Sequence, residues 1–240
     1  MAAMMSSGLA RIDELRELVE NPASPDAYFQ NFEQTLDEWP PKKRQFTDLE
    51  RELQGLDLPA WQHLKKDVVP LLQQRHPTRG WQLLFDKLNH AKAYSYLARI
   101  GCTSIRFIPE CPITGQKTPD LEAQLGPTKV LCEVKTINIS EIEATRRTRG
   151  GVGSTEAQVS DGFFNKVSAD LRNAQKQMNV YAGSNDARKI VYIVVNFDDP
   201  HHQYADDYKE QIDAFLSTNQ IISELEVQFD IKPPYYTAMS

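Results

Sequence analysis

The feature that most restricts the fold is one run of apolar, largely β-branched residues, Lys189 to Phe197. Its centre, Ile190 to Val195, contains no charged residue. A strand with one face in water alternates polar and apolar residues, whereas a strand covered on both faces is apolar throughout. The run therefore predicts a central strand covered on both sides, and with it an α/β fold.

The other patterns predict a mixed β-sheet flanked by helices, preceded by an N-terminal helical region. Apolar residues recur at helical spacing between residues 8 and 75, with breaks at prolines and no β-type alternation. We therefore expect an N-terminal helical region over 1–79 and an α/β domain over 80–240. The elements expected in the second domain are helices at 81–100, 161–181 and 204–216 and strands at 103–108, 118–124, 129–139, 189–197 and 224–229.

Charge and composition exclude several classes of protein. The chain has 27 Lys and Arg against 33 Asp and Glu, a net charge of −6, so it does not bind nucleic acid by bulk attraction. A nucleic-acid enzyme that relies on metal ions and a local basic patch stays compatible with this balance. Three cysteines without paired spacing argue against a disulfide framework or a zinc ribbon. The longest apolar run has six residues, far below the ~20 that cross a bilayer. We therefore expect a cytoplasmic protein without membrane association.

Two opposite charges interrupt the apolar run Lys129 to Ile137. Alternate residues of a strand share a face, so Glu133 and Lys135 lie on one face together with Leu131. A half-buried carboxylate and ammonium are costly unless they are paired or bind a metal. Such a conflict between pattern and burial indicates a functional site. The alternative is an exposed cross-strand ion pair.

A second carboxylate is expected beside Glu133. Asp120 begins the preceding strand, and Gly126-Pro127 suits an antiparallel turn between the two strands. Two neighbouring carboxylates cannot both stay ionised cheaply, and a divalent cation resolves that conflict. Mg²⁺ prefers oxygen ligands, and a water of lowered pKa can attack phosphorus while Lys135 offsets developing negative charge. This set is suited to phosphodiester hydrolysis.

The series Thr118-Pro119-Asp120, followed by Glu133-Val134-Lys135, resembles the active-site signature of the PD-(D/E)XK nuclease superfamily, which has the restriction-endonuclease-like fold. The resemblance covers about residues 80–200. It implies that Asp120 and Glu133 bind Mg²⁺ or Mn²⁺ with the backbone carbonyl of Val134, and that Lys135 is the catalytic lysine.

Members of the superfamily often add an acidic residue on the first core helix. Here Asp86 is the candidate, and Asn89 would be a departure from the family pattern.

Two further segments bear on the same chemistry. On the expected helix 161–181, Gln177 and Tyr181 lie one turn apart, and several nuclease groups of this superfamily carry such a Gln beside the site. A solvated helix edge is the alternative. The only compact arginine cluster, Arg146, Arg147 and Arg149, lies in a glycine-bearing stretch and is a candidate for gripping substrate phosphates; ordinary surface chemistry is the alternative.

The leading hypothesis is a divalent-metal-dependent nuclease that hydrolyses phosphodiester bonds with a metal-activated water. DNA rather than RNA is what the resemblance implies for the substrate. A catalytically inactive nuclease-like module that binds nucleic acid or protein is the alternative, and a structural helical protein with an incidental motif is a third. We expect the N-terminal helices to supply substrate contacts, a surface for a protein partner, or a homodimer interface.

Overall fold

The computed structural model describes residues 8–22, 24, 26–77, 79–111, 117–138, 157–184, 186–196, 204–219 and 224–231. These residues form two compact units, one that extends to Ser95 and one that runs from Tyr96 to Ile231. The helix α5 (Gln82–Arg99) contributes residues to both units. The expected division into 1–79 and 80–240 remains a prediction.

The first unit is helical, as the sequence predicts. It contains α1 (Ala10–Glu17), α2 (Phe32–Glu38), α3 (Pro40–Gln54), α4 (Leu58–Val68), the 3-10 helix η1 (Val69–Gln73) and the first part of α5. Its fully buried side chains include Ile12, Leu15, Phe32, Leu53, Trp61 and Leu64. The expected break at Trp39-Pro40-Pro41 is the start of α3, because proline is tolerated in the first turn of a helix.

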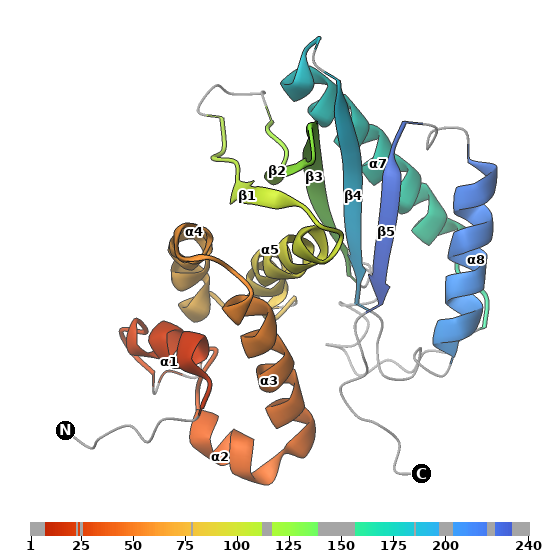
Figure 1. Cartoon of the computed structure of the whole chain (residues 1–240). Coiled ribbons are helices and arrows are strands. Elements are labelled where there is room, and N and C mark those ends of the chain that lie inside the picture. The colour runs from red at the N-terminus through yellow and green to blue at the C-terminus, as the bar shows by residue number, and fades with distance from the viewer. Residues whose placement is uncertain are drawn as a thin grey trace. The chain divides into compact units, whose positions relative to one another are not determined.

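The second unit is built on one mixed sheet, which confirms the predicted α/β fold class (Figure 1). Its strands are β1 (Thr103–Phe107), β2 (Leu121–Leu125), β3 (Thr128–Ile137), β4 (Ala187–Val195) and β5 (Glu226–Ile231), in spatial order β1-β2-β3-β4-β5. Antiparallel pairing joins β1 to β2 and β2 to β3. Parallel pairing joins β3 to β4 and β4 to β5.

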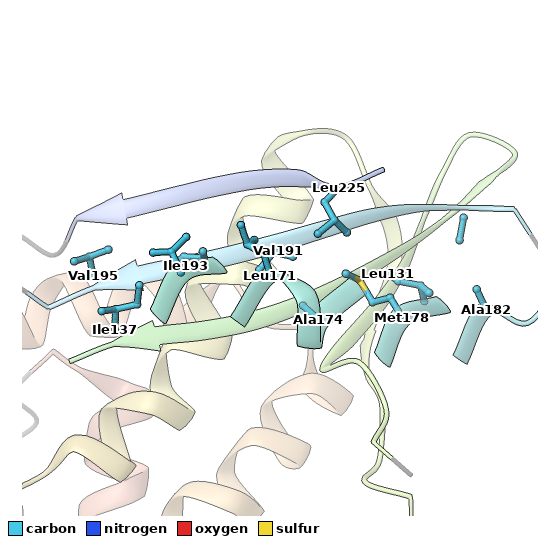
Figure 2. Close-up of a cluster of buried hydrophobic side chains, with 12 residues drawn as sticks. Leu131, Ile137, Leu171, Ala174, Met178, Ala182, Val191, Ile193, Val195 and Leu225 are labelled. Atoms are coloured by element: carbon cyan, nitrogen blue, oxygen red, sulfur yellow. The ribbon is translucent and has the colours of Figure 1, made fainter. Parts of the chain in front are cut away.

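Helix α7 (Asp161–Ala182) packs across one face of this sheet. Figure 2 shows Leu171, Ala174 and Met178 of α7 against side chains of β3 and β4. Helix α8 (Ala205–Thr218) lies beside α7, where the rings of Phe164 and Phe215 stack 4.7 Å apart. Strand β4 is buried from Ile190 to Val195, as its apolar run predicts.

The β2–β3 hairpin is tighter than the sequence suggests. Strand β2 begins at Leu121 rather than at the expected Thr118, and only Gly126 and Pro127 separate it from β3. Gly126 has a φ of 58°, a left-handed conformation that glycine adopts without strain. Leu121 pairs with Cys132 in the resulting register.

No helix in the described ranges is both long and apolar enough to span a membrane.

Candidate active site

The face of β3 that carries Glu133 and Lys135 is the face that α7 covers. Leu131 and Ile137, which share that face by strand alternation, belong to the hydrophobic core packed against α7. Glu133 is only 3% exposed, while a quarter of the Lys135 side chain remains accessible. The structure therefore places a carboxylate inside the layer between sheet and helix, with an ammonium group at its margin.

Asp120 immediately precedes β2 and approaches β3 from the neighbouring strand. Continuing the register by one residue from the Leu121–Cys132 pair places Asp120 across from Glu133. The Val134 amide donates a hydrogen bond of 2.7 Å to Oδ2 of Asp120, which fixes this carboxylate against β3. The hairpin thus brings together two carboxylates that lie 13 positions apart in the sequence.

Each oxygen of the Glu133 carboxylate has its own partner. Lys135 Nζ donates to Oε1 at 2.5 Å, and Gln177 Nε2 of α7 donates to Oε2 at 2.8 Å. Gln177 Nε2 also donates to the carbonyl of Thr118, just before Asp120. The Gln177 amide of α7 therefore links the face of β3 that carries Glu133 to the segment that leads into β2.

Burial and the nearby charge of Asp120 raise the pKa of Glu133 from 4.5 to about 7, against the opposing effect of Lys135. Burial also works to lower the pKa of Lys135. The charge and hydrogen bond of Glu133, together with the charges of Asp120 and Asp170, outweigh that effect, so the pKa of Lys135 is raised. The site holds a lysine that stays charged and a carboxylate that resists ionisation.

Two of the alternative interpretations that the sequence leaves open do not agree with the structure. Glu133 and Lys135 do form an ion pair, but Glu133 is buried rather than on an exposed face. Gln177 contacts Glu133 rather than lying on a solvated helix edge. Tyr181 does not join them, because its hydroxyl donates 3.0 Å to Oε2 of Glu122 instead.

The structure does not test the other predicted site residues. Arg146, Arg147 and Arg149 lie outside the described residues, so their proposed phosphate contacts remain predictions. Asp86 and Asn89 lie on the part of α5 that belongs to the first unit. The candidate site described above is built wholly from residues of the second unit.

A cluster around Glu122 was missed by the sequence analysis. Glu122 pairs with Arg106 of β1 and, at 3.1 Å, with Lys129 of β3. The Lys129 ammonium lies 5.0 Å from the centre of the Tyr181 ring. Strand alternation places Glu122 on the face of Asp120, two residues away, so the same period-two argument that selects Glu133 could have found it.

Asp170 of α7 was also missed as a site residue. It is 6% exposed, and its Oδ1 accepts a hydrogen bond of 2.6 Å from Lys166. Its Oδ2 is buried and has no hydrogen-bond partner among the described residues. The spacing of Asp170 and Gln177, seven residues or two helical turns, was the available signal.

The donor set fits a Mg²⁺ or Mn²⁺ ion. Within the described ranges no group of three or more His, Cys, Asp or Glu side chains is arranged to hold a metal. Mg²⁺, however, commonly uses one or two carboxylates and completes its shell with water and substrate phosphates. Asp120 and Glu133 supply two carboxylates. Burial and then the charge of Asp120 raise the pKa of Glu133, and a bound cation would offset both effects.

Comparisons of the chain with protein-family models, curated proteins and solved structures find no match.

Proposed function

We propose that this protein is a divalent-metal-dependent nuclease of the PD-(D/E)XK type, which hydrolyses phosphodiester bonds, with DNA as its substrate. The observation that carries the proposal is the approach of Asp120 to a buried Glu133–Lys135 pair across one hairpin. A buried, partly protonated carboxylate beside a second one weakens the apo fold, and such costs are retained at functional sites.

In this proposal Asp120 and Glu133, with the carbonyl of Val134, hold Mg²⁺ or Mn²⁺. The bound ion would supply an activated water and offset the charge of the scissile phosphate. Lys135 keeps its proton and stabilises the negative charge that develops on the phosphate oxygens. Gln177 holds the Glu133 carboxylate in orientation, as partners of metal ligands do.

The Glu122 cluster, defined as Glu122, Arg106, Lys129 and Tyr181, supports a nucleic-acid substrate. Its two cations outnumber its single carboxylate, and the Arg106 side chain is 67% exposed. Since Glu122 and Asp120 are two residues apart on one face, the surplus positive charge lies roughly 7 Å along the strand from the site. Arg106 and Lys129 are thus suited to hold a phosphate next to the scissile one.

The test is metal-dependent cleavage by the purified protein. Linear, circular, single-stranded and branched DNA and RNA are incubated with Mg²⁺, with Mn²⁺ and with a chelator. We expect cleavage that requires the ion and is abolished by Asp120→Asn and by Glu133→Gln with the circular dichroism spectrum retained. Asp186→Asn, an exposed aspartate before β4, is the matched control and should cleave normally. Equal cleavage by all four proteins would refute the assignment.

One observation favours a second candidate, a nuclease-like module that binds nucleic acid or protein without cleaving it. Both oxygens of Glu133 are already partnered, by Lys135 and Gln177, so the site is complete without an added ion. Calorimetry separates the two functions. Mn²⁺ binding that vanishes in Asp120→Asn supports the enzyme, and no binding at millimolar Mn²⁺ supports the module.

The roles of the N-terminal helices and the cytoplasmic location remain predictions.

A further inference from the structure

The buried oxygen Oδ2 of Asp170 requires an explanation. A carboxylate oxygen that is removed from water and left without a donor is destabilising, and such groups are rare in folded proteins. Asp170 is 6% exposed, and its one described partner, Lys166, binds Oδ1 from a side chain that is 57% exposed. The ion pair with Lys166 accounts for one oxygen and leaves the second unused.

The position of Asp170 on α7 places it over the stretch of β3 that contains Lys135. Asp170 precedes the core residue Leu171 and lies two turns from Gln177, on the side of α7 that contacts Glu133. Because α7 connects two parallel strands, it runs antiparallel to β3. The residues of α7 that precede Gln177, Asp170 among them, therefore lie over the part of β3 that follows Glu133 and contains Lys135.

Electrostatics agrees with this geometry. Three carboxylates act on the Lys135 ammonium, namely Glu133, Asp120 and Asp170. In the proposed function the first two bind the metal ion, and their charge is then shared with it. Asp170 is the remaining carboxylate of the three.

We propose that Asp170 is a positioning residue that receives the Lys135 ammonium when Glu133 and Asp120 are engaged by a cation. Lys135 then leaves Glu133 and donates to Oδ2 of Asp170, which has no hydrogen-bond partner among the described residues. This inference rests on the proposed function for its purpose. The exchange itself is a property of the apo chain that can be measured without metal.

The primary test is a double-mutant cycle between Lys135→Met and Asp170→Asn, measured as thermal unfolding midpoints without metal. The cycle is run in the wild-type chain and in Asp120→Asn/Glu133→Gln, where the competing acceptors are neutral. We expect a stabilising Lys135–Asp170 coupling in the neutralised background, worth a midpoint shift of about 2–4 °C, and a smaller coupling in the wild type. Absence of coupling in both backgrounds would overturn the proposal.

Lys166 provides the control. If Asp170 serves only its ion pair on α7, the cycle between Lys166→Met and Asp170→Asn shows coupling and the Lys135 cycle shows none. If our inference is correct, the Lys135–Asp170 coupling persists in a Lys166→Met background. Should the neutralised background fail to fold, the same cycle in Glu133→Gln alone decides the matter, since that change removes the hydrogen-bonded partner of Lys135.

A second readout uses the metal-loaded protein. Asp170→Asn should lower kcat about 10–100-fold while the calorimetric Mn²⁺ affinity and KM stay within about twofold, and Asp170→Glu should recover part of the loss. Loss of Mn²⁺ binding in Asp170→Asn would make Asp170 a ligand and contradict the inference. A wild-type protein that neither binds Mn²⁺ nor cleaves would refute the proposed function, yet the apo cycle would still decide the role of Asp170.

Discussion

Gln177 and Glu133, 44 positions apart in the sequence, are joined by a hydrogen bond of 2.8 Å from Nε2 to Oε2. The same amide nitrogen donates to the carbonyl of Thr118. Since Thr118 leads into Asp120, one side chain of α7 sets the distance between the strand that carries Glu133 and the segment that carries Asp120.

Replacing Gln177 by Leu should therefore damage the site more than the fold. Glu133 loses the donor to Oε2 and is then held only by Lys135 at Oε1, so metal affinity or kcat should fall about 10–100-fold. Calorimetry with Mn²⁺ and initial cleavage rates measure the two effects. Gln175→Leu is the matched control, because Gln175 lies on the same helix and contacts Glu224 instead. Equal losses in both variants would mean that general damage to α7, and not Glu133, is responsible.

The hairpin site could be predicted because its geometry is local. Strand alternation places Glu133 and Lys135 on one face, and a two-residue turn leaves little freedom in the position of Asp120. Helical spacing alone does not predict the contact between Gln177 and Glu133. It shows which residues share one side of a helix, but not which strand that side covers.

Strand alternation and helical spacing could have pointed to Glu122 and Asp170, but the partners of Glu122 and the burial of Asp170 could not be predicted in the same way. Arg106 reaches Glu122 only through the β1–β2 pairing, which contains a register irregularity near Thr103. The unused oxygen of Asp170 depends on how deeply α7 sits on the sheet, which is a consequence of packing around Leu171. Helical spacing places Asp170 on the same side of α7 as Gln177, but the depth at which its carboxylate is buried is decided by tertiary structure.

The contribution of Glu133 to the stability of the metal-free protein should fall as pH rises from 4.5 to 7. Glu133 has an ordinary pKa of 4.5 when unfolded and about 7 when folded, so the folded state binds an extra proton between these values. Its contribution to the free energy of unfolding is therefore most favourable below pH 4.5. This contribution falls by on the order of 2–3 kcal/mol as the pH rises to above 7. Urea unfolding at pH 5, 6, 7 and 8 should show Glu133→Gln gaining stability over wild type as pH rises. A difference that does not vary with pH would contradict the shift.

Glu122 should show the opposite dependence. Its burial works to raise its pKa, but hydrogen bonds from Lys129, Arg106 and Tyr181 outweigh burial and lower it. A lowered pKa stabilises the fold above the unfolded value near 4.5, and that stabilisation disappears as pH falls through the folded value. Glu122→Gln should therefore destabilise the protein at pH 7, with a difference that shrinks toward pH 3. A difference that grows on acidification would contradict this prediction.

Removing the charge of Arg106 or of Lys129 should weaken the binding only of substrates that carry neighbouring phosphates. Arg106→Met and Lys129→Met should each weaken the binding of a fluorescent oligonucleotide and reduce the slope of log K against log salt by about 0.7–0.9 per lost contact. Hydrolysis of bis(p-nitrophenyl) phosphate, which has no neighbouring phosphate, should stay unchanged. Lys176→Met removes the same charge from an exposed position of α7 and is the control. An equal effect of all three changes would indicate bulk electrostatics.

The first unit offers a prediction that is independent of function. The buried carboxylate of Glu50 in α3 accepts hydrogen bonds of 3.0 Å from the amides of Arg11 and Ile12, at the start of α1. A helix leaves its first amides without partners inside the helix, and Glu50 supplies acceptors that α1 lacks. Glu50→Ala should lower the free energy of unfolding by about 2–3 kcal/mol, because two amides lose their acceptor in a buried place. Denaturant unfolding followed by far-ultraviolet circular dichroism measures this.

Asp48→Ala on the same helix is the control for Glu50. Asp48 is 53% exposed and pairs with Arg51, which is 72% exposed, so its removal should change the free energy of unfolding by less than about 0.5 kcal/mol. The two variants differ in burial and not in helix or charge. If Glu50→Ala is as mild as Asp48→Ala, the capping of α1 by Glu50 does not stabilise this unit, and the packing around Ile12 must hold α1 without it.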